Sequence, residues 1–354
     1  MAAREPSYRF TLLRRALPPV LVVLALGLHA IVLVCYAFRW DRAAAVTTVP
    51  LLVWTAVGVS LLVLAWLASP AAGDTGYPNR VALFRRPSPW VLSAVLVWMA
   101  TYLLLGDEPP GLVRGLVRDP PAAAARTPGT TLRVATLNCR DRNTEAALEL
   151  EAFQPDIIFY QESPHRRALD EITQRLYGNE GSFIHTYDVS IAARGKLRAR
   201  SPHPSRHWLQ ASLTLADGRE IEIAGVHLTG AVTSLSLWRR STWKAYYRNR
   251  LQRRSEVTDL LAEVIRAAGP RPAIIAGDFN APPPDAIFRD LAVHFRDTYH
   301  QAGTGWSNTF SNTLPILRID QIWTTPEFAA AAHGTYKSVA SDHRFVVADL
   351  TLAP

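Results

Sequence analysis

The first third of the chain lacks the alternation of apolar and polar positions that is typical of a globular domain. Three long blocks contain no Asp, Glu, Lys or Arg, and their most apolar parts are residues 18–38, 46–67 and 90–105. A helix needs about 20 apolar residues to cross the hydrocarbon core of a bilayer. The pattern therefore predicts three transmembrane helices and a multi-pass protein of the cell membrane.

The first block has a second interpretation, a cleaved signal peptide. Ala43, Ala44 and Ala45 offer the small residues at which such a peptide could be cut. Against this, the apolar run is longer than the roughly 7–15 residues usual for the apolar region of a signal peptide, and two further blocks follow. We therefore favour a retained membrane anchor.

Basic residues flank the apolar blocks unevenly. Four arginines precede the first block and three lie between the second and third, whereas two lie between the first and second. In that order, the residues are Arg4, Arg9, Arg14 and Arg15; Arg80, Arg85 and Arg86; and Arg39 and Arg42. Loops rich in Lys and Arg tend to stay in the cytoplasm. We expect residues 1–17 to form a cytoplasmic tail and the C-terminal part to be extracytoplasmic.

A change of pattern follows the third block. Residues 107–130 are rich in Pro, Gly and Ala, which predicts a linker. From Leu132 onward, short apolar runs alternate with helical stretches, and Asp217-Gly218 between two such runs indicates a hairpin. Strands mixed with helices and a hairpin predict an α/β domain with mixed sheets over residues 131–354.

The composition adds little beyond this division. The chain is 49% hydrophobic and 19% charged, and the apolar blocks account for the low charge. The net charge of +8 fits nucleic acid, anionic lipid or phosphorylated substrates, but also merely basic flanks of membrane helices. The two cysteines, Cys35 and Cys139, lie far apart, which argues against a structural disulfide and excludes a site built on several cysteines.

Polar residues gather where the predicted strands end. The motifs that contain them are TLN, ending at Asn138; PDIIFYQE, ending at Glu162; VHL, around His227; GDFN, with Asp278 and Asn280; IDQI, with Asp320; and SDH, with Asp342 and His343. Loops at the edge of a sheet build sites on a rigid base. One such residue is usually a solvated cap, but six motifs in this order predict a functional site.

In these motifs the sequence resembles the endonuclease/exonuclease/phosphatase superfamily of DNase I-like enzymes, over nearly all of residues 131–354. The resemblance implies a four-layer α/β sandwich, two mixed β-sheets flanked by helices, here preceded by three transmembrane helices. It also implies a divalent cofactor, Mg²⁺ or Mn²⁺. The membrane helices lie outside this resemblance and look like those of a bacterial membrane-anchored subgroup that includes VanJ-type teicoplanin-resistance proteins.

Chemistry and the resemblance together suggest roles for these residues. Attack by water on a phosphoester adds charge to oxygens, which a hard cation with oxygen ligands neutralises. We expect Glu162 to be the main metal ligand, with Asn138 and Asp342 as further ligands. Asp278 and Asn280 match the family's pair at the attacking water, where Asp278 would orient or deprotonate the water and Asn280 would hold a phosphate oxygen.

The resemblance extends to two histidines. Asp320 and His343 match a carboxylate–imidazole pair, in which the carboxylate orients the ring and favours its protonated form. His227 matches the second histidine, a donor to the phosphate or the leaving group. Arg194 is a candidate phosphate contact or a plain surface residue, and Asn138 is also a candidate for substrate binding.

The substrate is left open by the sequence. Basic residues interleave with aromatic ones over residues 238–250, which suits nucleic acid, a membrane interface with Trp238, Trp243, Tyr246 and Tyr247 against the lipid, or a helix that covers a sheet. Because of the tether we favour a lipid-linked or cell-envelope phosphoester. The alternatives are a membrane-tethered nuclease and a non-catalytic scaffold that binds phosphates.

Overall fold

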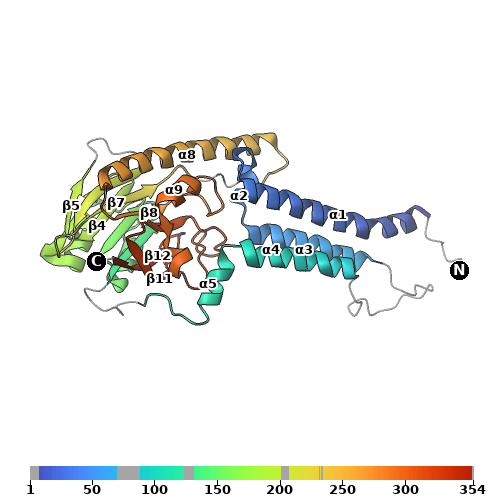
Figure 1. The fold of residues 1–354 in the computed structure, drawn as a ribbon, viewed down its shortest axis with the longest axis horizontal. Coiled ribbons are helices and arrows are strands. Elements are labelled where there is room, and N and C mark those ends of the chain that lie inside the picture. The colour runs from blue at the N-terminus through green and yellow to red at the C-terminus, as the bar shows by residue number, and fades with distance from the viewer. Residues whose placement is uncertain are drawn as a thin grey trace. The chain divides into compact units, whose positions relative to one another are not determined.

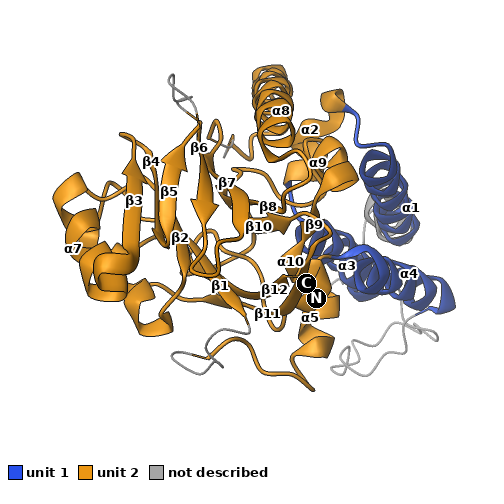
Figure 2. Ribbon diagram, turned by 60° about the vertical axis from the view of Figure 1, so that its left-hand side comes forward, with its two compact units in different colours: residues 1–40, 49–106 blue, residues 41–48, 107–354 orange. Residues whose placement is uncertain are grey.

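The computed structural model describes residues 8–69, 88–122, 131–200, 207–230, 232 and 234–352. The chain forms two compact units, one of residues 1–40 and 49–106 and one of residues 41–48 and 107–354 (Figure 2). Part of the expected cytoplasmic tail, and the basic residues used to orient the chain between the second and third blocks, lie outside the described residues. These are residues 1–7, Arg80, Arg85 and Arg86.

The first unit is made of apolar helices: α1 (Tyr8–Phe38), α3 (Leu51–Ala68) and α4 (Pro89–Leu105) (Figure 1). Residues 16–38 of α1 and the whole of α3 are long and apolar enough to cross a membrane. By contrast, α4 has 17 residues and counts toward a span only together with the next helix. Two helices, rather than the expected three, therefore meet the requirements for a span by themselves.

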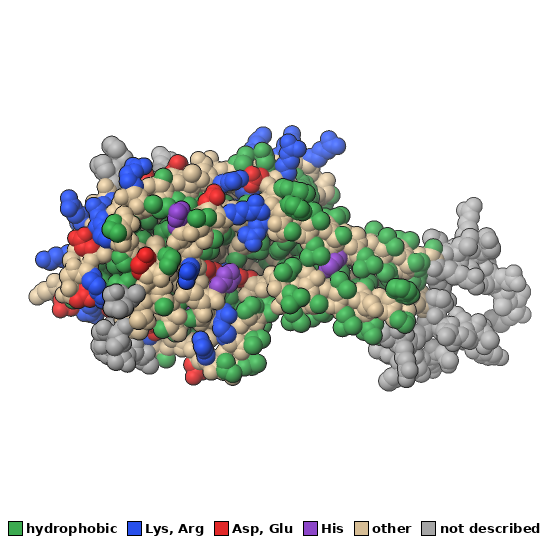
Figure 3. Space-filling view, in the orientation of Figure 1, with side chains coloured by type: hydrophobic (Ala, Val, Ile, Leu, Met, Phe, Trp, Pro, Cys, Tyr) green, Lys and Arg blue, Asp and Glu red, His purple; other side chains and the backbone are tan. Residues whose placement is uncertain are grey.

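Packing in the helical unit leaves apolar side chains on its surface. Gly58 on α3 makes room for the indole of Trp98 on α4, since a Cβ at this position would lie 2.2 Å from the ring. Large apolar side chains such as Val23, Leu64 and Leu104 are exposed. The space-filling view shows hydrophobic side chains over this unit and mixed charges over the other (Figure 3). An apolar exterior is what a membrane-embedded bundle requires.

The second unit contains two six-stranded mixed sheets (Figure 1). The first sheet has the order β11-β12-β1-β2-β4-β3 and consists of β1 (Leu132–Asn138), β2 (Ile157–Gln161), β3 (Gly181–His185), β4 (Val189–Arg194), β11 (Phe328–Tyr336) and β12 (Phe345–Leu352). The second has the order β5-β6-β7-β8-β10-β9 and consists of β5 (Lys196–Ala199), β6 (Trp208–Thr214), β7 (Glu220–His227), β8 (Ala273–Asp278), β9 (Arg296–Asp297) and β10 (Asp320–Thr324).

Helices cover the outer faces of both sheets. The longer ones are α7 (Arg166–Tyr177) and α8 (Arg240–Ala268), and the short ones, of five to seven residues, are α2 (Ala44–Thr48), α5 (Glu108–Arg114), α6 (Thr144–Leu148), α9 (Phe288–His294) and α10 (Thr298–Ala302). Single 3₁₀ turns span Asp41–Ala43, Glu149–Phe153 and Gly178–Glu180. One core lies between the sheets, a second lies under α6 and α7, and a third lies under α8 and α9. Four layers result, and the expected α/β sandwich is confirmed.

The expected linker differs from the structure. Residues 107–122 belong to the second unit, and α5 begins with Pro109-Pro110, which fit the first turn of a helix. Arg114 donates to the backbone carbonyls of Tyr299 and Gly303 at 2.9 and 2.7 Å. Tertiary contacts thus fix a segment whose composition alone suggested flexibility. Residues 123–130 lie outside the described part of the chain.

Candidate active site

The strand pairing brings the sequence motifs to one edge of the two sheets. The parallel strands β7 and β8 end together, so His227 lies opposite Asp278. Asp320 begins the antiparallel strand β10 and also pairs with Asp278. Asn138, at the end of β1, pairs with Gln161 at the end of the parallel strand β2. The ends of four strands and the beginning of a fifth, from distant parts of the sequence, therefore converge.

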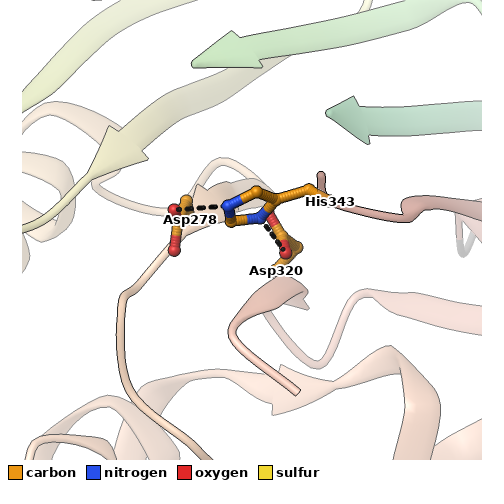
Figure 4. A group of neighbouring side chains, drawn as sticks. All are labelled: Asp278, Asp320 and His343. Atoms are coloured by element: carbon orange, nitrogen blue, oxygen red, sulfur yellow. Dashed lines mark hydrogen bonds and ion pairs between the residues drawn. The ribbon is translucent and has the colours of Figure 1, made fainter. Parts of the chain in front are cut away.

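His343 and Asp320 form a buried carboxylate–imidazole pair (Figure 4). Nδ1 of His343 lies 2.9 Å from Oδ2 of Asp320, and its Nε2 lies 4.0 Å from Oδ2 of Asp278. Burial by itself would lower the pKa of His343, but the carboxylate of Asp320 outweighs it and the pKa rises to about 10. The ring is therefore protonated at neutral pH and carries a proton that Nε2 can donate.

A second pair joins His227 to Asp188. Nδ1 of His227 lies 2.9 Å from Oδ2 of Asp188, and Nε2 lies 3.8 Å from Oδ2 of Asp278. Burial lowers the pKa of His227, but the hydrogen bond to Asp188 and the charge of Asp278 together raise it to about 9. Sequence reasoning missed Asp188, which stands in the turn between β3 and β4. It could have been sought in the sequence, because His343 had been given a carboxylate partner and His227 had not.

Asp278 lies between the two histidines. Burial and the negative charge of Asp320 raise its pKa, so the carboxylate is a better proton acceptor than an exposed one. The backbone N–H of Asn280 donates to Oδ1 of Asp278 at 2.8 Å, and Nδ2 of Asn138 donates to Oδ2 at 3.2 Å. Gly277 has a φ of +144°, and a Cβ there would lie 2.1 Å from the carbonyl of Val226, which explains the glycine before Asp278.

Asn138 also connects Asp278 to Glu162. Its Nδ2 donates to Oε1 of Glu162 at 3.2 Å, and the backbone N–H of Asp141 donates to Oε2 at 2.6 Å. Two carboxylates thus approach one amide from positions 24 and 140 residues later in the chain. An oxygen-only donor set with excess negative charge fits a hard divalent cation, so Glu162 and Asn138 fit the expected metal site.

Other predicted residues lie differently. Among the described residues, no side-chain hydrogen bond or ion pair joins Asp342 to Glu162, although Asp342 directly precedes His343. Asp278, Asp320 and His343 have potential ligand atoms within 4.8 Å of one another. A protonated imidazole has no free lone pair for a metal, so the ligand atoms that this trio offers to a cation are those of its two carboxylates.

Arg194 is not brought to this edge. Its guanidinium pairs with Glu180 at 3.1 Å and with Asp156 at 3.5 Å, and its backbone N–H donates to the carbonyl of Asp156. Asp156 precedes β2, whereas the site lies at the other end of that strand. The structure thus corrects the expected phosphate contact, because β4 runs antiparallel to β2 and carries Arg194 away from the site.

A polar cavity of about 520 Å³ adjoins the His343 loop. Its lining includes the side chains of Arg140, Asn312, Lys337, Ser341 and Asp342. The backbone of Arg140 is tied to the site, since its N–H donates to Oδ1 of Asn138 at 3.0 Å. The cavity offers cationic and hydroxyl groups to an anionic substrate beside the catalytic edge.

The site thus combines two imidazolium donors around a buried carboxylate with oxygen ligands that suit a cation. On an α/β sandwich, this combination is typical of enzymes that hydrolyse phosphoesters. Residues 134–343 match the Endonuclease/Exonuclease/phosphatase family, and the chain belongs to this family. Its members cleave phosphoester bonds and generally depend on a divalent metal. The expected phosphoester hydrolase is confirmed. No curated protein matches the chain in sequence.

Solved structures resemble the second unit. An endonuclease/exonuclease/phosphatase from Bacteroides vulgatus is 19% identical, covers 63% of this chain and 99% of its own, and has a TM-score of 0.50. A mannosyl-6-phosphatase from Bacteroides thetaiotaomicron is 20% identical over 62% of this chain and 100% of its own, with a TM-score of 0.46. D. rerio TDP2 with a single-strand DNA product is 16% identical over 63% and 99%, with a TM-score of 0.47. At these identities the first structure supports the fold alone.

Proposed function

We propose that the chain is a membrane-anchored, divalent-metal-dependent hydrolase of lipid-linked or cell-envelope phosphoesters, with its catalytic unit outside the cytoplasm. The observation that carries the catalytic part is the placement of Asp278 between two carboxylate–imidazole pairs, His343 with Asp320 and His227 with Asp188. Carboxylate partners keep both rings protonated and oriented, which prepares them to stabilise charge on a phosphate.

Each residue then has one task. Asp278 orients the attacking water and accepts its proton, a role that its raised pKa favours. His343 donates from Nε2 to a phosphoryl oxygen, and His227 donates to the leaving-group oxygen. Glu162 and Asn138 would hold the cation, which supplies charge neutralisation at the phosphate when bound. Asn280 contributes to the position of Asp278 through its backbone and is available to the phosphate through its amide.

The preference for a lipid-linked substrate is supported by the way the chain is connected. The second unit contains residues 41–48 and residues 107–354. Along the chain, each junction between this unit and the first one therefore adjoins an apolar helix. A substrate held in the bilayer is thereby kept at a high effective concentration. Exposed Trp238, with 80% of its surface accessible, suits a membrane interface. Membership of the VanJ-type subgroup belongs to the same proposal.

A substrate panel tests this proposal on the full chain reconstituted in anionic vesicles with Mg²⁺ or Mn²⁺. We expect turnover of a long-chain isoprenyl phosphoester to exceed that of a short water-soluble analogue with the same headgroup by at least about tenfold in kcat/KM. Equal turnover of the two would overturn the lipid preference. Alkaline phosphatase fused after Leu350 should be active in cells, and an inactive fusion would place the catalytic unit in the cytoplasm.

Nucleic acid is the second candidate because α8 has a basic outer surface. Arg239, Arg240, Lys244 and Arg248 are exposed near the start of this helix. Such a stretch suits phosphate contacts along a strand. Faster turnover of single-stranded DNA than of any lipid phosphoester, with a steep decrease in rising salt, would favour this candidate.

A further inference from the structure

Helix α8 has a buried polar face despite its basic and aromatic composition. Tyr246, Arg250, Arg253 and Glu256 are at most 3% exposed and follow one another at spacings of three or four residues. Side chains at these spacings share one side of a helix. The expectation that Tyr246 meets lipid with its neighbours is therefore corrected. This side of α8 faces the interior of the second unit.

The inward arginines hold the loop that follows β8. Arg250 and Arg253 both pair with the fully buried Asp285, at 3.0 Å through Nε and 3.4 Å through Nη2 respectively. Arg253 also donates from Nη1 to the backbone carbonyl of Asn280. Asn280 in turn donates its backbone N–H to Asp278. Arg253 thus reaches the proposed catalytic carboxylate through one intervening residue, and Arg250 is linked to Arg253 through Asp285.

The same face of α8 holds the loop that follows β7. Glu256 accepts hydrogen bonds from the backbone N–H of Thr229 at 3.0 Å and from its hydroxyl at 2.5 Å. Thr229 stands two residues after His227. Asn280 closes the arrangement, since its Nδ2 donates to the carbonyl of Leu228 at 2.9 Å. Both loops that carry catalytic residues from the second sheet are therefore attached to α8.

Arg250 has another set of partners in the Asp41–Thr48 segment, which joins α1 to α3 along the chain. Its Nη2 donates to Oγ1 of Thr47 at 2.5 Å and to the carbonyl of Ala44 at 3.5 Å. Thr47 is fully buried, and Ala44 and Ala45 pack with Tyr246. Two buried arginines pair with one buried aspartate here, and a single carboxylate cannot accept hydrogen bonds from all the N–H groups of two guanidinium groups. The hydroxyl of Thr47 and the carbonyl of Ala44 therefore provide further acceptors for Arg250.

We propose that Asp41–Thr48 is a positioning element of the active site. Seated on α8, it fixes Arg250 and, through Asp285 and Arg253, holds Asn280 and Asp278 in their working geometry. The hydrolase is thus fully active only when the connection between its first two apolar helices is seated on α8. Because a displacement of about 1 Å at a reacting group can cost two orders of magnitude in rate, a small shift of this loop is enough.

The test uses the full chain in vesicles with a phosphoester that the wild type hydrolyses, and therefore rests on the proposed function. Thr47→Val keeps the shape of the side chain and removes the acceptor. We expect kcat to fall by about 5- to 30-fold with a smaller change in KM. Thr47→Ser restores the acceptor and should recover most of kcat. Asp41→Asn is the matched control, since it weakens only the partly exposed 3.2 Å pair with Arg254 in the same segment.

A double-mutant cycle separates positioning from general destabilisation. In an Arg253→Met background, Thr47→Val should lower kcat by less than about twofold further, because the link from Arg250 through Asp285 and Arg253 to the backbone of Asn280 is already broken. If Thr47→Val does not fold, Thr47→Ala takes its place in the cycle. Unchanged kcat in Thr47→Val, or an undiminished loss in the Arg253→Met background, overturns the inference. An inactive wild type across the substrate panel would instead count against the proposed function.

Discussion

Replacing Asp320 with Asn tests the charge state of His343 directly. In the wild type, the Asp320 carboxylate 2.9 Å from Nδ1 raises the pKa of His343 to about 10 against the effect of burial. Asparagine keeps the size of the side chain but cannot hold a negative charge. With burial lowering the pKa and Asp278 still present at 4.0 Å, we expect a pKa of about 6.5, the ordinary value for histidine.

The loss of activity then depends on pH in a calculable way. A group with a pKa of about 6.5 is about 90% protonated at pH 5.5 and about 3% protonated at pH 8, whereas the wild-type ring stays protonated at both. The ratio of wild-type to Asp320→Asn kcat/KM should therefore grow by about 30-fold between these pH values, on top of a constant loss from poorer orientation. Any effect of pH on the metal that is common to both enzymes cancels in this ratio.

The assay is a pH series of kcat/KM for both enzymes at saturating metal. A ratio that stays constant from pH 5.5 to pH 8 would refute the reasoning, because it would mean that the carboxylate does not set the charge of His343. Thermal unfolding provides an independent check with a defined sign. Since the folded-state pKa lies above 6.5, the pair stabilises the fold fully below pH 6.5 and loses this contribution as the pH rises through about 10.

Three further predictions follow from the geometry. Asp188→Asn should lower kcat by about 10- to 100-fold and move the alkaline limit of activity below pH 9, since Asp188 helps to raise the pKa of His227; an unchanged pH profile would contradict this pairing. Glu162→Gln should raise the metal concentration for half-maximal activity by about 10- to 100-fold, while excess metal restores part of the rate; full activity of either enzyme in EDTA would exclude the metal site. Arg194→Ala should keep kcat within about twofold, since the residue lies at the other end of β2, and a large kcat loss without unfolding would return it to the site.

The sequence alone was sufficient for the class of fold, and most of the site residues that it predicts lie together at one edge of the sheets. Charge-free blocks predict membrane helices because an apolar run of about 20 residues matches the thickness of the hydrocarbon core of a bilayer. By itself, however, α4 has 17 residues and is too short for a span. Asn138, Glu162, Asp278 and Asp320 stand at ends of strands that local apolar runs already mark. Parallel strands end at a common edge, and the antiparallel strand β10 begins there, so these positions converge once the sheets form.

Only the tertiary structure decided which polar side chains meet. Asp188 is an ordinary turn residue until β3 and β4 place it 2.9 Å from His227. Arg194 looks like a phosphate contact until the antiparallel direction of β4 carries it to the far end of the sheet. In α8, basic and aromatic residues surround the helix, so periodicity does not reveal that Arg250 faces inward. The partner of a buried charge is set by packing between segments that lie far apart in the chain. The local sequence around either residue therefore does not predict that contact.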